Sequence, residues 1–326
     1  MNERVSVIIC TADRHNSLRK TLESLEKSIY KNLEIIVVDA SLSDDTLKLI
    51  NEISANFLFV IKFAKVSQRN ISVSRNVGIR LATKASIVAF IDDDAIAPPE
   101  WIEELLATYT KYGEKCAGVG GAVRDMTTPG NPLQYRRGIT NIISSTIPVR
   151  PKNAPDYNQS KSFWYSALMG ANSSYRKVAL DEIGGYNEFF DYFLDETDVC
   201  LRIIQAGYQI HHSDVVVDHY PAKSHNREDQ KHLTCWYSLA KNTTYFAIKY
   251  GYNRIPLIIL VIRLTLLLAY RCFARILRLR LTHNLPFSIM WKYINESIHG
   301  IRVGWEAGFA LYTSNDILKD YSITNG

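Results

Sequence analysis

The first half of the chain alternates short apolar runs with stretches in which apolar residues recur every three or four positions. The runs predict buried strands, and the three- or four-residue spacing predicts amphipathic helices. The predicted strands are 5–10, 33–38, 57–63 and 85–91, and the predicted helices between them are 16–28, 44–53 and 74–83. Because strands that alternate with helices form βαβ units, the pattern predicts an α/β fold with a mainly parallel, doubly wound sheet.

Carboxylates follow two of these predicted strands. Asp39 comes after the second strand, and Asp92-Asp93-Asp94 come after the fourth. Three adjacent acids do not belong in a core, because buried charges must be paired or bind metal. Ligands of open α/β sheets bind at the carboxyl ends of the strands, so the triplet indicates a divalent cation that holds a phosphate. The alternative is a solvated acidic turn before the helix that Pro98-Pro99-Glu100 would open.

The order and spacing of several motifs resemble the inverting GT-A glycosyltransferases of family two. The matching segments are Val5–Thr11 (opening strand), Asp39–Thr46 (the D-N-G-S-T-D-G-T turn), Ser74–Gly78 (A-R-N-x-G), Asp92–Asp94 (the DxD signature) and Gly170–Arg176 (G-x-N-x-x-x-R). The turn departs from the family pattern at Ala40, Ser41 and Leu42. The resemblance implies a GT-A catalytic domain over 1–228, with a nucleotide-sugar-binding half at 1–124 and an acceptor-side half at 125–228.

A further segment resembles the family's G-G-F-D-E … E-D-x-D-L-x-x-R pattern. It comprises Gly184–Glu188 and Asp195–Arg202, in which the usual Glu-Asp order is reversed. The resemblance places Glu196 at the position of the general base, which takes the proton of the acceptor hydroxyl. The swap keeps Asp195 as a second candidate. Asp198 is expected at the acceptor side or as a helix cap, and the alternative for the whole cluster is an acidic helix N-terminus favoured by the helix dipole.

The resemblance also implies a nucleotide site. Asp39 is expected to accept the imino N–H of a uracil or thymine ring, and Thr11 is expected near the same base. Arg75 is expected to reach the nucleotide or its phosphates. The alternatives are a turn-capping aspartate for Asp39, an arginine on the helix surface for Arg75 and, in the G-x-N segment, a simple turn residue for Asn172.

The metal and the diphosphate are expected at the triplet. Asp92 is assigned to the ribose or the metal and Asp94 to the metal, while Asp93 is assigned to the same nucleotide-sugar site as support for the turn. Some relatives carry a histidine near the metal or diphosphate after a late strand, and His219 stands at that place; a surface histidine is the alternative. The expected cofactor is Mn²⁺ or Mg²⁺, which neutralises a departing diphosphate.

Other parts of the catalytic half carry fewer signals. Further predicted elements are a helix at 101–112 and strands at 117–123, 162–168 and 208–218. Residues 125–160 contain five prolines and little periodicity, so a long loop on the acceptor side is expected. Lys223, His225 and Arg227 are interpreted as solvated loop charges. Residues 230–233 do not match the Q-x-x-R-W motif of processive synthases, which favours transfer of one or a few sugars.

Composition narrows the functional classes. The 326 residues carry a net charge of +5, which is too mild to indicate nucleic-acid binding. The five cysteines are scattered, so neither disulfides nor a zinc site are expected and a reducing cytoplasm fits. The N-terminus leads straight into a strand, which predicts no signal peptide.

The C-terminal residues 229–326 differ in character. After a predicted helix at 236–250, the apolar stretch 255–270 contains Arg263 and continues into further arginines, namely Arg271, Arg275, Arg278 and Arg280. Arg263 makes a membrane-spanning helix costly. Apolar bulk beside a basic face favours a helix that lies on an anionic membrane, with a helical hairpin packed on the catalytic domain as the alternative. A last helix at 286–310 offers Trp291 and Trp305 as interfacial anchors.

These observations predict a metal-dependent inverting glycosyltransferase. Its donor is expected to be a UDP- or dTDP-sugar, and its acceptor a hydroxyl of a lipid-linked or surface-polysaccharide precursor. The expected location is cytoplasmic, peripheral to the inner face of the cell membrane. One alternative is a non-catalytic scaffold that binds nucleotide-sugar and membrane. Another is a sugar-1-phosphate nucleotidyltransferase, which is disfavoured because the turn 10–14 lacks the glycine-rich phosphate loop of that class.

Overall fold

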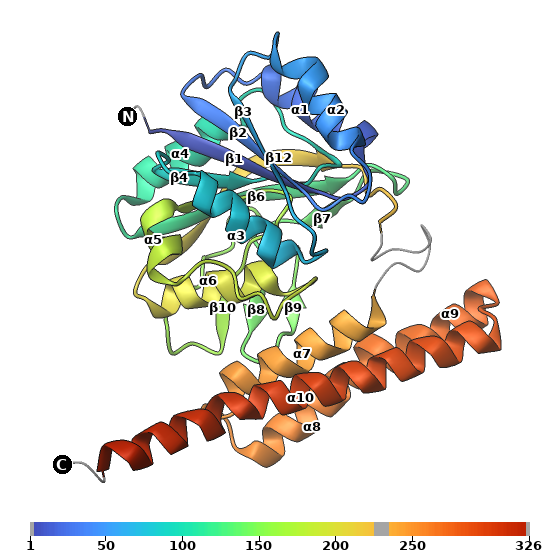
Figure 1. Cartoon of the computed structure of the whole chain (residues 1–326). Coiled ribbons are helices and arrows are strands. Elements are labelled where there is room, and N and C mark those ends of the chain that lie inside the picture. Colours follow the sequence, from blue (N-terminus) through green and yellow to red (C-terminus); the bar gives the residue numbers. More distant parts are fainter. Residues whose placement is uncertain (1–2, 225–234, 324–326) are drawn as a thin grey trace. The chain divides into compact units, whose positions relative to one another are not determined.

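The structure is a computed structural model that describes residues 3–224 and 235–323, with the helix but not the side chains described for 314–323 (Figure 1). The chain forms two compact units. The first comprises 1–140, 146–191 and 195–224, and the second comprises 141–145, 192–194 and 225–326. The predicted boundary at 228 and the predictions for His225, Arg227 and 230–233 lie outside the described residues.

The first unit begins with four parallel strands. Their order is β3 (Ile61–Lys65), β2 (Leu33–Asp39), β1 (Val5–Thr11) and β4 (Ile87–Phe90), and the helices between them are α1 (His15–Glu26), α2 (Asp45–Ser54) and α3 (Ile71–Leu81). The strands are apolar on both faces because helices cover the sheet, and Leu18, Leu22 and Leu25 of α1 are buried in this core. The predicted βαβ organisation is confirmed.

Beyond β4 the sheet becomes mixed. The strand β11 (Ser173–Arg176) lies antiparallel between β4 and β6 (Cys116–Asp125), and β12 (Gln209–His219) runs parallel to β6. The short strands β5 (Ala95–Ile96) and β7 (Leu133–Tyr135) pair antiparallel with β12 and β6. Because β1, β2, β4, β6 and β12 all point the same way, their carboxyl ends meet at one edge of the sheet (Figure 1). That edge is where Thr11, Asp39, Asp92 and His219 emerge.

Three expectations need correction. The third strand begins at Ile61 rather than at 57, because Phe57 and Phe59 pack edge to face on each other, with Phe59 in the core, before the strand starts. Residues 125–160 are not one long loop: besides β7 they contain β8 (Ile139–Asn141) and β9 (Thr146–Ile147), which form a small sheet with β10 (Trp164–Ser166). The helix predicted at 44–53 begins at Asp45, and the Asp44 side chain makes no capping hydrogen bond and lies 3.6 Å from Lys65.

The remaining helices of the first unit are α4 (Trp101–Tyr112), α5 (Lys177–Glu182) and α6 (Asp195–Gln205). α4 has the bounds that were predicted, whereas the sequence pattern gave no bounds for α5 or α6. α4 ends at Gly113, whose φ of 74° is a backbone conformation that favours glycine. α6 carries the acidic pair of the sequence motif in its first turn.

A buried charged cluster joins residue 156 to β12. Asp156 lies 2.9 Å from His211 Nδ1 and 2.6 Å from His212 Nδ1. His212 Nε2 lies 3.0 Å from the carbonyl oxygen of Ala167. A carboxylate and a carbonyl only accept hydrogen bonds, so each nitrogen of the His212 ring faces an acceptor. Asp156 therefore ties residue 156 to β12 through both histidines.

Replacing Asp156 by asparagine is expected to lower the free energy of unfolding by roughly 2–4 kcal/mol at pH 7, because the buried rings of His211 and His212 lose the carboxylate that pairs with both. Burial alone would raise the pKa of Asp156, but the hydrogen bonds from His211 and His212 lower it far below the usual range. The stabilisation is thus present above the unfolded-state pKa of about 3.9 and lost as the pH falls below it. Urea unfolding should show the difference between the two proteins shrinking by about 1 kcal/mol between pH 7 and pH 3; an unchanged difference would contradict the assignment.

The second unit is helical. Its elements are α7 (Trp236–Gly251), α8 (Leu257–Leu268), a π-helix η1 (Ala269–Ala274), α9 (Arg275–His283) and α10 (Phe287–Ile323). α7 and α10 pack closely through three glycines spaced four residues apart, Gly300, Gly304 and Gly308. A Cβ at Gly300 or Gly304 would meet the backbone of α7, so these positions require glycine. The glycine spacing was not used in the sequence-based prediction, although it was visible there.

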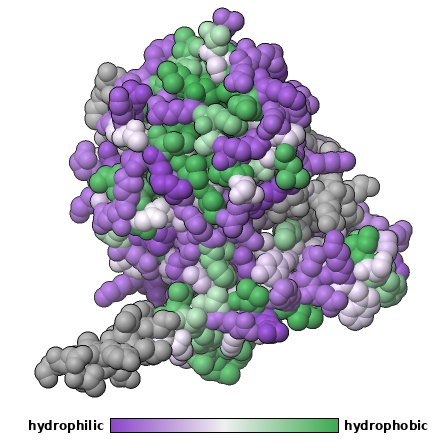
Figure 2. Space-filling view, viewed as in Figure 1, coloured by the Kyte–Doolittle hydropathy of each residue, from purple (hydrophilic) through white to green (hydrophobic). Residues whose placement is uncertain are grey.

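The helices from 257 to 283 expose much apolar surface. Leu257–His283 is long and apolar enough to cross a membrane, by length and composition. Its exposed apolar side chains are Leu257, Ile258, Ile259, Ile262, Leu266, Tyr270, Leu277 and Leu281. Figure 2 shows hydrophobic residues at the surface of the C-terminal helices beside hydrophilic ones. This mixture resembles the surface of helices that lie at a membrane interface.

Candidate active site

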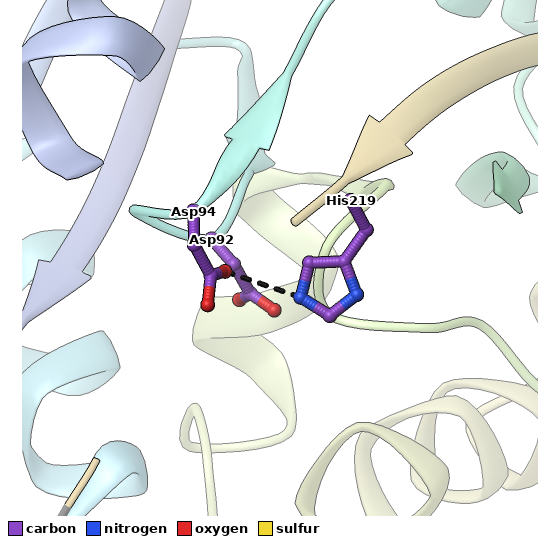
Figure 3. A group of neighbouring side chains, drawn as sticks. All are labelled: Asp92, Asp94 and His219. Carbon is purple, nitrogen blue, oxygen red and sulfur yellow. Dashed lines mark hydrogen bonds and ion pairs between the residues drawn. The ribbon is translucent and has the colours of Figure 1, made fainter. Parts of the chain in front are cut away.

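Two loop carboxylates and one imidazole converge at the carboxyl edge of the sheet. Asp92 and Asp94 lie in the loop after β4, and His219 ends β12 (Figure 3). Their ligand atoms all lie within 4.8 Å of one another. Asp94 and His219 are buried, and Asp92 is half-buried. The sequence placed these residues 125 positions apart, and the parallel run of β4, β6 and β12 brings them together.

The hydrogen bonds of His219 fit a cation at this place. Nδ1 lies 2.9 Å from Gln134 Oε1, so the proton belongs on Nδ1. Nε2 then lies 3.1 Å from Asp94 Oδ1, which sets two acceptors face to face. A divalent cation or a second proton removes that conflict. Two carboxylates and one imidazole nitrogen are ligands that suit Mn²⁺, and Gln134 orients the imidazole as outer-shell partners of metal sites do.

Asp93 points away from this group into the core. Thr11 Oγ1 donates to Asp93 Oδ2 at 2.5 Å, and Arg14 Nε donates to the same oxygen at 3.0 Å. Arg14 also forms an ion pair with Asp94, at 2.9 Å. Asp93 thus supports the turn, as expected. Thr11 is engaged by this carboxylate, and its predicted place near the base stays a prediction.

The pKa values of Asp92, Asp93 and Asp94 differ because burial and the neighbouring charges differ for each carboxyl. Burial raises the pKa of Asp93 to about 7, and the opposing charge of Arg14 only partly offsets it. Burial also raises the pKa of Asp92, helped by the charge of Asp94. For Asp94 burial acts in the same direction, but contacts with His219 and Arg14 outweigh it and lower its pKa to about 2. Asp94 is therefore the most firmly ionised of the three.

Asp39 is fully buried at the end of β2, opposite Thr11 in the register of β1. Its Oδ1 accepts the backbone N–H of Ser41 at 2.9 Å and the Ser41 hydroxyl, and its Oδ2 accepts Lys65 Nζ at 3.0 Å. The contact with Ser41 is the turn-capping arrangement that sequence reasoning kept as the alternative. The predicted contact with a pyrimidine base stays a prediction.

Arg75 contacts the acid pair at the start of α6. Its guanidinium forms ion pairs with Asp195 and, at 3.1 Å, with Glu196 Oε1. It lies over the rings of Phe90 and Tyr186, with its Cζ 5.7 Å and 5.1 Å from their centroids. Only 4% of the side chain is exposed. Two carboxylates thus pair with Arg75, and its predicted contact with the nucleotide or its phosphates stays a prediction.

The two acids of α6 differ in access. The Glu196 side chain is 20% exposed, whereas that of Asp195 is 3% exposed. Glu196 Oε1 also accepts the backbone N–H of Gly170 at 3.1 Å. Burial would raise the pKa of Glu196, but Arg75 and the hydrogen bonds outweigh it and lower the pKa. Burial and the charge of Glu196 raise the pKa of Asp195. Glu196 is therefore the ionised and accessible member of the pair.

The acid pair and the metal-ligand group act on each other electrostatically. The charge of Arg75 lowers the pKa of Asp92, and the charge of Glu196 raises it. Both groups therefore belong to one site at the carboxyl edge of the sheet. A site with a cation-binding group beside an ionised carboxylate can stabilise a leaving phosphate and remove a proton from a hydroxyl.

Two other motif residues are structural. Asn172 is buried; its Oδ1 accepts Trp101 Nε1 at 2.8 Å, and its Nδ2 donates to the carbonyl of Ala122 at 2.9 Å. Asp198 is buried and accepts Arg202 Nε at 2.7 Å. Arg202 also donates to the carbonyl of Gly185, which fixes the glycine turn before α6. These contacts hold the motif segments in place.

Sequence reasoning missed three residues that hold the site. Arg14 and Lys65 follow the first and third strands, so their position at the carboxyl edge was a usable signal. Gln134 carried no such signal, because it lies in the segment that was expected to be a loop.

Comparisons with known proteins agree with this arrangement. Residues 6–184 match the model of glycosyl transferase family 2. The glucosyl-dolichyl phosphate glucuronosyltransferase of Haloferax volcanii is 29% identical over 211 residues, which cover 62% of this chain and 64% of that protein. An uncharacterised protein of Sinorhizobium fredii is 29% identical over 213 residues, covering 63% of this chain and 23% of its own length. This chain thus spans less than two thirds of these relatives.

Solved structures show the same fold. GalNAc-T7 with UDP, GalNAc and Mn²⁺ superposes with a TM-score of 0.60 at 15% identity, covering 76% of this chain and 48% of that chain. The mannosyltransferase PcManGT from Pyrobaculum calidifontis, in complex with GDP-Man and Mn²⁺, superposes with a TM-score of 0.56 at 16% identity, covering 94% and 86%. The GT-A fold predicted from the sequence is confirmed. Because the family model covers more than half of its residues, the chain belongs to glycosyl transferase family 2.

Proposed function

We propose that the chain is a metal-dependent, inverting glycosyltransferase that moves a sugar from a nucleotide-diphosphate donor to a hydroxyl acceptor. The observation that carries this proposal is the pairing of the group Asp92, Asp94 and His219 with the ionised and accessible Glu196 in one site. A cation-binding group without a base, or a base without that group, would not support the complete reaction.

The donor is assigned to the carboxyl edge of the sheet. Asp92, Asp94 and His219 would hold Mn²⁺ or Mg²⁺, and the bound ion would supply charge neutralisation to the departing diphosphate. Arg14 and Thr11 keep Asp93 and the turn in position, so the two ligand carboxylates keep their spacing. Asp39 remains the proposed partner of the base, which favours a UDP- or dTDP-sugar.

The acceptor side is assigned to Glu196. The acceptor hydroxyl oxygen forms a bond to the anomeric carbon while the bond from that carbon to the diphosphate oxygen breaks. The attack comes from the face opposite the diphosphate, so the anomeric configuration inverts. The hydroxyl proton passes to Glu196, and the bonding electron pair leaves with the nucleoside diphosphate.

Arg75 and Asp195 are proposed as positioning residues for this base. Arg75 holds Glu196 from one side and the Gly170 N–H holds the same oxygen from another, which fixes the orientation of the carboxylate. Asp195 contacts the same guanidinium. Without Asp195, the guanidinium would pair with Glu196 alone and lower its basicity further.

The acceptor is proposed to be a lipid-linked or surface-polysaccharide precursor, met at the cytoplasmic face of the cell membrane. The exposed apolar side chains of Leu257–His283 and the arginines among them support a helix that lies on an anionic membrane. The name of the Haloferax volcanii relative, which includes a dolichyl phosphate, supports a lipid-linked acceptor. The domain division at 228 and the peripheral location stay part of this proposal.

Calorimetric titration with nucleotide-sugars, with and without Mn²⁺, tests the donor half of the proposal. One donor is expected to bind only in the presence of the ion. NMR of the product formed with that donor should then show inverted anomeric configuration. Retained configuration would overturn the proposed mechanism, and metal-dependent binding without any turnover on membrane extract would favour the scaffold alternative.

A further inference from the structure

Arg271 is a mostly buried cation in the helical unit. It lies in the π-helix η1, and its guanidinium has only neutral polar partners among the described residues. NH1 donates to Thr243 Oγ1 at 2.9 Å and contacts Ser144 Oγ at 3.3 Å, and NH2 donates to the Ser144 carbonyl at 2.9 Å. The guanidinium carbon lies 5.2 Å from the ring centroid of Phe193.

This environment leaves a positive charge without a counter-ion. Arg271 forms no ion pair with a carboxylate of the described chain, and nearby Cys272 is a neutral thiol. Arg14 and Arg75 each face two carboxylates. The buried Arg150 instead donates to the backbone carbonyls of Arg137 and Pro155 and has no carboxylate partner among the described residues. Removing a cation from water is costly unless other groups compensate it. Among the described residues, the three hydrogen bonds of Arg271 leave Nε and a second N–H of NH2 available, which is the edge that binds phosphate in a bidentate manner.

A second cation follows one helical turn later. Arg275, four residues on, is exposed, and its guanidinium carbon lies 5.5 Å from the ring centroid of Trp236. It also has no carboxylate partner among the described residues. Residues four apart on a helix lie on one face, and π-helical turns are frequent at functional sites. Both cations therefore lie on one face of the helical segment.

The surroundings of Arg271 connect it to the chain segment before the base. Phe193 and Leu194 have positive φ angles of 77° and 69°, which are uncommon for such side chains. Asn242 Nδ2 of α7 donates to the carbonyls of Tyr192, at 2.7 Å, and Phe193, at 3.1 Å, and Arg271 covers the Phe193 ring. Leu194 is followed directly by Asp195 and Glu196 in the sequence. Backbone strain of this kind is typical of segments that serve a site.

We propose that Arg271, with Arg275, binds the phosphate of a lipid-linked acceptor, in which a sugar joined to that phosphate supplies the reacting hydroxyl. The proposal rests on the proposed glycosyltransferase function and adds to it the group by which the acceptor is recognised. The apolar residues Ile262, Leu266 and Tyr270 precede Arg271 on the same continuous helix and are 53%, 65% and 78% exposed. A lipid phosphate presents its anion beside hydrocarbon, so it matches a cation that follows an exposed apolar stretch. Soluble phosphates share the anion but not the apolar part.

The test is binding of the full-length protein to vesicles, measured by co-sedimentation. The vesicles contain phosphatidylcholine alone, or phosphatidylcholine with a small fraction of either polyprenyl monophosphate or phosphatidylglycerol. Arg271→Gln keeps polar contacts to Ser144 and Thr243 but removes the charge. It is expected to weaken binding to the polyprenyl phosphate vesicles by roughly tenfold or more, the effect of losing a charge-assisted hydrogen bond. Arg278→Gln, an exposed arginine on the same helical segment, is the matched control and should weaken binding no more than about threefold.

A second variant and further controls of the vesicle assay test the same site. Arg275→Gln changes an exposed residue and tests the site even if the Arg271 variant does not fold, and it should also weaken binding to the phosphate lipid selectively. Equal losses of vesicle binding in the Arg271, Arg275 and Arg278 variants would overturn the site in favour of general attraction to anionic membranes. The same loss of binding to phosphatidylglycerol vesicles would have the same meaning.

Competition by soluble pyrophosphate without any binding of the lipid phosphate would overturn the lipid assignment. Metal-dependent donor binding, measured in the same preparations, should be unchanged in every variant; its absence in the wild type would instead refute the proposed function.

Discussion

Replacing Glu196 by glutamine is expected to lower sugar transfer by about 10³-fold while donor binding stays intact, because the reaction loses its general base. Glutamine keeps the shape of the side chain and can still accept the Gly170 N–H, so the loss reports the missing basicity rather than a changed fold. Steady-state rates of product formation, with donor affinity measured by calorimetry, separate the two effects.

The matched control for this change is Glu182→Gln. Glu182 is an exposed glutamate at the end of α5 that accepts a hydrogen bond from Tyr208. Its replacement should leave the transfer rate within about twofold of the wild type, as is usual for surface substitutions. A Glu196→Gln enzyme that retains most of its activity, together with an inactive Asp195→Asn enzyme, would assign the base to Asp195.

The pH profile distinguishes the same two acids. A base works in its ionised form, so activity falls as the pH drops through its pKa. The pKa of Glu196 is lowered, which predicts activity at saturating Mn²⁺ that stays level down to pH values below the usual glutamate pKa. The pKa of Asp195 is raised well above the usual range, so a base at Asp195 would make activity fall at much higher pH.

Replacing Asp94 by asparagine is expected to lower Mn²⁺ affinity by at least on the order of 100-fold and to abolish transfer at ordinary metal concentrations. Asp94 is the most firmly ionised acid of the triplet, and it also anchors the turn by accepting the Ala222 N–H at 2.9 Å and Arg14 NH1 at 2.9 Å. Electron paramagnetic resonance of bound Mn²⁺ measures the affinity without any enzymatic turnover.

Asp181→Asn is a suitable control, because Asp181 is an exposed acid that pairs only locally with Lys177. It should leave Mn²⁺ binding unchanged. Normal Mn²⁺ affinity in the Asp94 variant would show that the group Asp92, Asp94 and His219 is not the metal site.

The fold was largely predictable from the sequence because its signals are local. Residues close to each boundary predict the ends of the apolar strands β1, β2 and β4. The same holds for α4, which has prolines before it and Gly113 after it. The antiparallel entry of β11 between β4 and β6 was not predictable in this way. It depends on pairing between segments more than 50 residues apart, which leaves no local pattern.

The residues of the candidate site also differ in whether a local sequence pattern predicts them. Asp92, Asp94 and His219 could be named because each follows a strand, and parallel strands end at a common edge. The ion pairs of Arg75 could not be predicted, because its partners lie on α6, 120 and 121 positions away. The uncompensated charge of Arg271 was also invisible, since only the folded chain shows which arginines have carboxylate partners.

The most direct test of the central claim is the release of free nucleoside diphosphate from a panel of nucleotide-sugars. The assay uses membrane extract as the source of acceptor, with and without Mn²⁺, and compares the wild type with Glu196→Gln. We predict Mn²⁺-dependent release from one donor by the wild type and its loss in the variant. Metal-dependent donor binding with no release from any donor would contradict the claim and leave the chain a nucleotide-sugar-binding scaffold.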